Sequence, residues 1–86
     1  MIEIDENYES AYFYRAESYY NLDDNENAIV DYTNAINLNN TDFEYYLGRS
    51  FCYRNIGKTE KSCEDYKKAV ELDPTLAERI VLEFCE

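Results

Sequence analysis

The chain of 86 residues repeats itself at a fixed offset. One shift of the sequence places Arg15 on Arg49, and it also pairs Tyr12 with Tyr46, Tyr19 with Tyr53, Asn21 with Asn55, Asp31-Tyr32 with Asp65-Tyr66, Ala35 with Ala69 and Leu38 with Leu72. A fixed period equal to the separation of Arg15 and Arg49 indicates stacked copies of one supersecondary unit. Because stacked repeats usually form binding surfaces rather than active sites, the offset constrains function as well as fold.

Each copy contains two segments in which apolar residues recur at helical spacing, with turn residues between them. The predicted helices cover residues 9–22 and 26–38 in the first copy and residues 43–55 and 60–72 in the second. Thr41 or Asp42 is expected to cap the third helix, and Pro74 is expected to end the fourth. One more helix is predicted over residues 76–85, so the chain is expected to be all-α with about five helices.

These residues resemble the tetratricopeptide repeat, a helix–turn–helix motif whose period matches the offset of this chain. The resemblance covers residues 9–76, and it is carried by Tyr12, Ala16, Tyr19, Ala28, Tyr32, Ala35 and Leu38 in the first copy and by Tyr46, Ser50, Tyr53, Ser62, Tyr66, Ala69, Leu72 and Pro74 in the second. It implies an α-solenoid in which antiparallel helix pairs form a right-handed superhelix. The chain departs from the family pattern at Arg15 and Arg49, which replace the usual leucine, at Asn40, which replaces the first proline, and at Phe84, which replaces a small residue.

The resemblance divides the chain into four parts. Residues 9–42 are repeat 1, residues 43–76 are repeat 2, and residues 77–86 are predicted to form a C-terminal capping helix, because Phe84 would obstruct a following helix. Residues 1–8 are interpreted as the tail of an upstream repeat or an N-terminal extension. The chain is therefore either a fragment of a longer array or a short array with reduced ends.

The net charge of −11 is concentrated in residues 1–42, which contain ten acidic residues and one basic residue, Arg15. An acidic field repels nucleic acid and anionic lipid and attracts basic partners. A protein or peptide partner is therefore expected, and neither nucleic acid nor a membrane is. The alternative is that the acidic residues only keep a tyrosine-rich surface soluble.

The sequence offers no membrane or secretion signal. No apolar run approaches the ~20 residues of a membrane span, and Met1 leads directly into an acidic segment. Cys52, Cys63 and Cys85 are odd in number and lack a CxxC spacing, so buried, reduced thiols are expected. Together these features predict a cytoplasmic protein.

No constellation of residues points to catalysis, a cofactor or a metal. Histidine is absent, which removes the commonest general base. Asp23 and Asp24 are interpreted as a solvated turn and helix cap. Gly57-Lys58-Thr59 is interpreted as a turn, because it lacks the upstream glycine and the strand of a phosphate-binding loop. The chain is predicted not to be an enzyme and to use no cofactor.

In tetratricopeptide repeat folds the first helix of each repeat lines a concave groove, so the resemblance implies a protein–protein interaction there. The predicted partner-binding residues are Phe13, Tyr14, Glu17, Tyr20, Asn21, Leu47, Phe51, Arg54, Asn55, Val81 and Leu82, with Glu44 and Gly48 at neighbouring groove positions. An apolar groove edged with carboxylates suits a helix or extended peptide with basic flanks. The alternative is that Phe13, Phe51 and Leu82 only pack between adjacent helices.

One known type of groove is not expected here. Family members that bind chaperones grip a C-terminal carboxylate with lysine, asparagine, asparagine, lysine and arginine on successive first helices. The corresponding positions in this chain are Phe13, Glu17, Gly48, Glu78 and Leu82. None of the five matches, and two are acidic and would repel a carboxylate.

A structural role is the alternative function. In the predicted C-terminal helix, apolar residues cover about half of the circumference, more than the ~100° stripe of a one-sided helix. Terminal repeats normally expose a polar face. A homo-oligomer that forms through this helix, around Ile80 and Phe84, is therefore the competing hypothesis.

Overall fold

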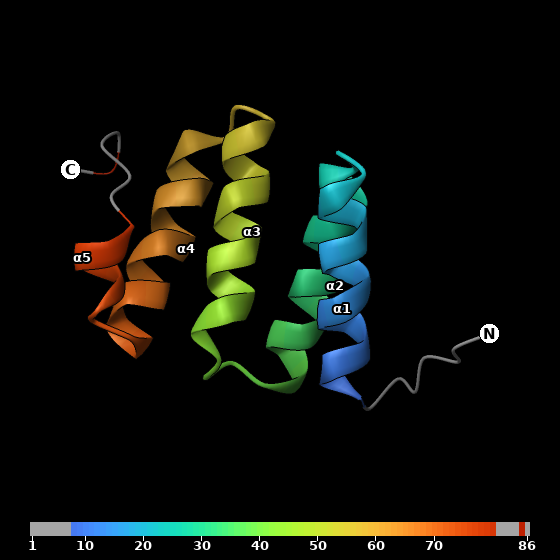
Figure 1. The fold of residues 1–86 in the computed structure, drawn as a ribbon, viewed down its shortest axis with the longest axis horizontal. Helices are drawn as coiled ribbons and strands as arrows, with labels where there is room; N and C mark the ends of the chain where they lie inside the picture. The colour runs from blue at the N-terminus through green and yellow to red at the C-terminus, as the bar shows by residue number, and fades with distance from the viewer. Residues whose placement is uncertain (1–7, 81–84, 86) are drawn as a thin grey trace.

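The computed structural model describes residues 8–80 and Cys85. In this part of the chain it contains five helices and no strand: α1 (Glu9–Asn21), α2 (Asn25–Leu38), α3 (Phe43–Asn55), α4 (Thr59–Leu72) and α5 (Leu76–Arg79). The first four helices stand side by side as two antiparallel pairs, α1 with α2 and α3 with α4 (Figure 1). The all-α prediction is confirmed, and the predicted bounds of α1 to α4 agree closely with the observed ones.

The turns of the two repeats have matching conformations. Asp23 (φ 61°) and Gly57 (φ 81°) occupy equivalent positions of the two repeats, and both adopt the positive φ that closes a helix–helix turn. The Asp24 carboxylate then accepts a hydrogen bond from the backbone N–H of Asn27 at the start of α2. Asp42 caps α3 in the same way, by accepting a hydrogen bond of 2.9 Å from a backbone N–H in its first turn. Asp42, rather than Thr41, is therefore the cap.

Small residues let the two helices of each repeat approach closely. Ala16 and Ala28 are fully buried between α1 and α2, and Ser50 and Ser62 take the same places between α3 and α4. Each serine hydroxyl donates a hydrogen bond to the backbone carbonyl of the other residue, at 2.7 Å from Ser50 and 2.8 Å from Ser62. This exchange satisfies two hydroxyl groups whose burial would otherwise be destabilising.

The two arginines that depart from the family pattern bind buried aspartates on the second helix of each repeat. Arg15 contacts both carboxylate oxygens of Asp31, at 2.5 and 2.8 Å, and Arg49 contacts both of Asp65, at 2.7 and 2.8 Å. Burial lowers the pKa of Arg49, but the hydrogen bonds and charge of Asp65 outweigh it and the net shift is upward. Arg49 also donates from Nη1 to Oγ1 of Thr33 on α2, so it links the two repeats.

Two apolar clusters form the core. The larger one joins the repeats to α5 and consists of Ala35, Ile36, Tyr45, Tyr46, Ala69 and Leu76, whereas the smaller one consists of Ala16, Ala28, Tyr32 and Cys52. Phe13 packs against both clusters, with its ring centroid 5.1 Å from that of Tyr45 and 6.1 Å from that of Tyr32. Phe13 therefore contributes to the packing between helices.

The C-terminal segment differs from the predicted helix over residues 76–85. Helix α5 ends at Arg79, and Ile80 has an extended backbone (φ −133°, ψ 113°). The Tyr66 hydroxyl donates a hydrogen bond to the Ile80 carbonyl, and the Ile80 side chain packs against the larger cluster. These contacts hold Ile80 against α4 and the larger cluster. Residues 81–84 and 86 lie outside the described residues.

The prediction of buried, reduced cysteines is wrong for Cys63 and Cys85. Cys63 on α4 and Cys85 form a disulfide, with their Cα atoms 5.2 Å apart. Spacing along the sequence does not reveal this pair, because it depends on the position of Cys85 beside α4 in the folded protein. Cys52 is free and buried, and burial raises the pKa of its thiol to about 11. Since disulfides persist mainly in oxidising compartments, the cysteines no longer support the prediction of a cytoplasmic protein.

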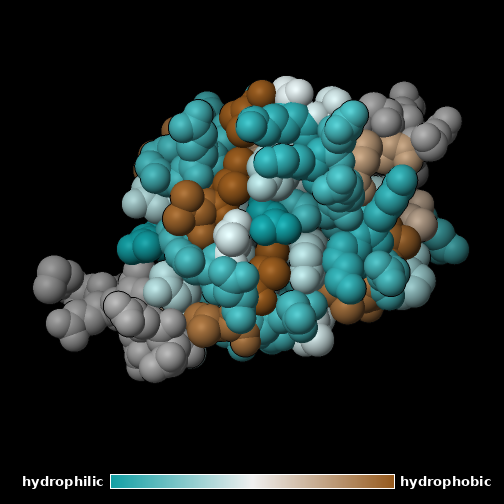
Figure 2. Space-filling view, turned by 180° about the vertical axis from the view of Figure 1, so that it is seen from behind, coloured by the Kyte–Doolittle hydropathy of each residue, from teal (hydrophilic) through white to brown (hydrophobic). Residues whose placement is uncertain are grey.

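The described helices can be compared with the length and apolar character that a membrane span requires. None of them is both long enough and apolar enough to span a bilayer. The surface seen from behind Figure 1 is mainly hydrophilic, with smaller hydrophobic patches between the polar side chains (Figure 2).

Candidate partner-binding groove

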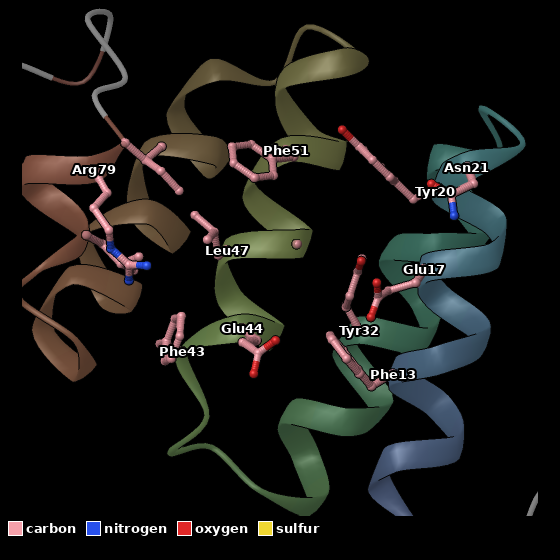
Figure 3. Close-up of a pocket in the computed structure, with 13 residues that line it drawn as sticks. Phe13, Glu17, Tyr20, Asn21, Tyr32, Phe43, Glu44, Leu47, Phe51 and Arg79 are labelled. Atoms are coloured by element: carbon pink, nitrogen blue, oxygen red, sulfur yellow. The ribbon is translucent and has the colours of Figure 1, made fainter.

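A groove with a volume of about 440 Å³ lies between the two repeats and extends to α5 (Figure 3). Helix α1 contributes Phe13, Glu17, Tyr20 and Asn21, helix α2 contributes Tyr32, helix α3 contributes Phe43, Glu44, Leu47, Gly48 and Phe51, and the α5 region contributes Leu76, Arg79 and Ile80. Most of these side chains are apolar or aromatic. The groove can therefore bury the apolar face of a ligand between α1 and α3.

Helical spacing explains why these residues share one surface. Phe13, Glu17 and Tyr20 lie at positions i, i+4 and i+7 of α1, which places them on one face of the helix. On α3, Glu44, Leu47 and Phe51 follow the similar spacing i, i+3 and i+7. Since α1 and α3 are the first helices of successive repeats, their corresponding faces lie beside each other.

The structure brings part of the predicted partner-binding set together in this groove. The predicted residues that line it are Phe13, Glu17, Tyr20, Asn21, Leu47 and Phe51. Tyr14 does not line it, and 65% of its surface is exposed. Arg54 lies over the ring of Phe51, with its guanidinium carbon 5.1 Å from the ring centroid. Asn55 instead donates a hydrogen bond to Asn25 at the start of α2, and Val81 and Leu82 lie outside the described residues.

Reasoning from the family pattern missed Tyr32, and it also missed Phe43, Leu76, Arg79 and Ile80 as groove residues. That pattern assigns the groove to the first helices, whereas Tyr32 reaches it from α2 because Gly48 on α3 has no side chain. A Cβ atom at Gly48 would lie 2.6 Å from Cε1 and 2.7 Å from Oη of Tyr32, closer than such atoms approach. The replacement of Tyr14 in repeat 1 by Gly48 in repeat 2 was the available sequence signal.

The groove has a negative electrostatic character. Glu17 and Glu44 both line it, and Figure 3 shows their carboxylates directed into it from α1 and α3. Burial raises the pKa of Glu44, and the negative charges of Asp42 and Glu17 raise it further. Arg79 is the one basic residue among the described lining residues, and its charge is paired with Asp73 at 3.2 Å. A positively charged ligand group would therefore be attracted to this surface.

The family model of the tetratricopeptide repeat matches residues 9–42 and 43–76. The chain belongs to the tetratricopeptide repeat family. The two matched spans are the ones that the sequence offset predicted, and the five helices form an α-solenoid of helix pairs. The family is one of non-catalytic repeat scaffolds that bind proteins or peptides. No curated protein sequence is significantly similar to this chain.

The two tetratricopeptide repeats share scaffold residues but differ in the groove. The arginine–aspartate pair and the buried small residues recur at equivalent positions of the two repeats, whereas Glu17 of repeat 1 corresponds to Phe51 of repeat 2. At this level the groove therefore has a carboxylate on α1 and an aromatic ring on α3. The two walls of the groove therefore offer different chemical groups to a ligand.

Proposed function

We propose that the groove between α1 and α3 binds a helix or an extended peptide of another protein, and that this partner carries basic residues. The observation that supports the proposal is the combination of aromatic side chains with two carboxylates, those of Glu17 and Glu44, in one groove. Aromatic side chains give large contact area at low entropic loss, and the carboxylates favour cationic partners over anionic ones. The net charge of −11 acts in the same direction over longer distances.

The same charges argue against a C-terminal carboxylate as the main ligand group. Such a ligand would bring a negative charge next to Glu17 and next to Glu44, whose pKa is raised by burial and further by nearby negative charge. Like charges in a partly desolvated groove disfavour binding. A chaperone-tail ligand is therefore not proposed.

Selection from a phage-displayed library of random dodecapeptides tests the proposal. Peptides recovered on the wild-type protein are synthesised, and their dissociation constants are measured by fluorescence anisotropy. Leu47→Gln and Phe51→Gln remove apolar groove surface and should weaken binding at least ~10-fold, about 1.4 kcal/mol. Val30→Gln is the matched control, since Val30 is exposed and outside the groove. Unchanged binding by both groove variants would contradict the proposal.

Self-association through the terminal helices is the alternative prediction. Within the described residues, Ile80 packs against the larger core cluster of its own chain, so its side chain is partly used by the fold. Phe84 lies outside the described residues. Sedimentation velocity at micromolar concentrations decides between the two functions: a concentration-independent monomer contradicts self-association.

A further inference from the structure

The Tyr32 hydroxyl is a polar group in the groove that has no hydrogen-bond partner among the described residues. The Tyr32 side chain is buried to all but 3% of its surface, and no residue that the structure describes forms a hydrogen bond with its oxygen. Among those residues, no fully enclosed side-chain oxygen or nitrogen lacks a partner. The Tyr32 oxygen is therefore reachable from the groove, into which it points beside Glu17 (Figure 3).

The corresponding tyrosine of repeat 2 shows how such a hydroxyl is normally satisfied. Tyr66 is the equivalent of Tyr32 in repeat 2, and its hydroxyl donates a hydrogen bond to the backbone carbonyl of Ile80. Tyr32 instead lies directly against Gly48, whose missing side chain makes room for the ring edge and the hydroxyl. Because buried polar groups usually have hydrogen-bond partners, the unpartnered Tyr32 oxygen indicates a position that a ligand group completes.

The charge around the Tyr32 oxygen indicates which ligand group that is. Glu17 acts electrostatically on Tyr32 and on Glu44, and it raises the pKa of both, after the larger effect of burial. No basic side chain of the described residues forms an ion pair with either glutamate. A neutral phenol oxygen beside an unpaired carboxylate accepts hydrogen bonds from an ammonium or guanidinium group, which has only donors.

The position of Glu17 within the groove indicates where along a bound peptide the basic residue would lie. On α1, Glu17 lies one turn from Phe13 and one turn from Tyr20, and all three line the groove. On the opposite wall, Leu47 and Phe51 flank Gly48. A ligand that follows the groove therefore has apolar residues on both sides of the group that reaches Tyr32.

We infer that Tyr32 and Glu17, with Glu44 nearby, form a recognition pocket for a lysine or arginine side chain that lies in the middle of the bound peptide, between its apolar anchors. The cation donates hydrogen bonds to Tyr32 Oη and to the Glu17 carboxylate, and its aliphatic stem packs along the aromatic groove. This inference rests on the proposed function and makes it more specific, because the basic residue is central to the ligand and not only at its flanks.

The first test changes the ligand alone. Peptides selected from the dodecapeptide library on the wild-type protein should share a basic residue between apolar positions. Replacement of this lysine by norleucine keeps its aliphatic stem and removes the ammonium group, and replacement of this arginine by citrulline keeps the length of the side chain and removes its charge. The dissociation constant should rise at least ~10-fold, as expected for loss of a charge-assisted hydrogen bond. Replacement of a basic residue at the end of the same peptide should have a smaller effect.

The second test changes the protein. Tyr32→Phe removes a hydroxyl that no described residue binds, so the melting temperature should stay the same while peptide affinity falls about 10-fold. Tyr14→Phe is the matched control, because Tyr14 is exposed and does not line the groove. Glu17→Gln/Glu44→Gln should weaken binding further, whereas Glu26→Gln/Glu71→Gln changes the net charge equally outside the groove.

The outcomes separate the inference from the proposed function. If the selected peptides depend on Leu47 and Phe51 but tolerate norleucine, and if Tyr32→Phe binds as wild type does, the groove is a binding site and the cation pocket is wrong. If no peptide is selected, or if Leu47→Gln and Phe51→Gln have no effect, both are wrong. If Tyr32→Phe loses affinity together with thermal stability, Tyr32 has a structural role and the inference fails.

Discussion

The ring edge of Tyr32 lies directly against Gly48, on the neighbouring repeat. A Cβ atom at Gly48 would come within 2.7 Å of the Tyr32 hydroxyl oxygen, so the α2–α3 packing and the shape of the groove both depend on a residue without a side chain. Glycine inside a helix is intrinsically unfavourable by about 1 kcal/mol relative to alanine. Its place in the middle of α3 is therefore explained by this contact and not by helix formation.

The Tyr32–Gly48 contact predicts that Gly48→Ala changes the free energy of unfolding in opposite directions with and without the Tyr32 ring. Gly48→Ala should lower the free energy of unfolding by about 1 kcal/mol, because the overlap with the ring outweighs the gain in helix propensity. In the Tyr32→Leu background, which lacks the ring atoms in question, Gly48→Ala should raise it by up to ~1 kcal/mol. Urea unfolding followed by circular dichroism measures both values. Equal effects in the two backgrounds would show that the contact is unimportant.

The Arg49–Asp65 pair predicts that replacement of Asp65 alone destabilises the fold more than replacement of both residues. Asp65→Leu leaves the Arg49 charge without its partner in a mostly buried site, and it should destabilise the fold by about 3 kcal/mol. The further change Arg49→Leu, which restores the usual residue of the family, should recover most of this loss. Arg54→Leu, on the exposed part of α3, is the control and should change stability by less than ~0.5 kcal/mol. Additive losses in the double variant would contradict this account.

The Cys63–Cys85 disulfide predicts a definite thiol count. Ellman's reagent should detect no thiol in the native protein, because Cys52 is buried, and one thiol after denaturation without reductant. The disulfide joins residues at a sequence separation of 22, so its reduction should lower the free energy of unfolding by about 3 kcal/mol. Three reactive thiols in the denatured, unreduced protein would show that the disulfide is absent.

The raised pKa of Glu44 predicts how binding depends on pH. The groups that face Glu44 are Glu17 on α1, Tyr32 on α2, Asp42 at the start of α3 and Arg79 on α5. A bound cation favours the carboxylate form and lowers the pKa of Glu44, so the complex holds fewer protons than the free protein. Affinity should therefore fall as the pH falls through the raised pKa of Glu44. Glu44→Gln should flatten this part of the profile.

Glu44 should have the opposite effect on the stability of the free protein, which should fall as the pH rises. Burial and neighbouring negative charge disfavour the Glu44 carboxylate in the folded state. Its contribution to stability is therefore fully present below the unfolded pKa and is lost as the pH rises through the folded pKa. Thermal unfolding of the wild type and Glu44→Gln across this range measures the difference. A profile that Glu44→Gln leaves unchanged would assign the pH dependence to other groups.

Much of the scaffold could be predicted from the sequence because it depends on local or periodic signals. The turn residues around Asp24 and Asp42 mark helix starts, and the internal period identifies the repeats. The C-terminal segment could not be predicted in this way. Its path depends on contacts between distant residues, namely the hydrogen bond from Tyr66 to Ile80 and the disulfide of Cys63.

The candidate groove was predictable only in part for a similar reason. Phe13, Glu17 and Leu47 follow from the helical spacing of the first helices, which the family pattern supplies. Tyr32 does not, because its place in the groove depends on the close approach of α2 to Gly48 on a different helix. A periodic pattern assigns residues to faces, whereas the chemistry of the groove is set by such contacts between helices.

Chemical-shift mapping tests the central claim most directly, namely that the α1–α3 groove binds a basic peptide. A ¹⁵N-labelled sample is titrated with a library-selected peptide, and amide shifts are followed by NMR. The largest shifts should occur at Glu17, Tyr20 and Gly48, with little change at Val30 and Leu38, which are exposed outside the groove. Shifts concentrated at Val30 and Leu38, with Gly48 unchanged, would contradict the claim.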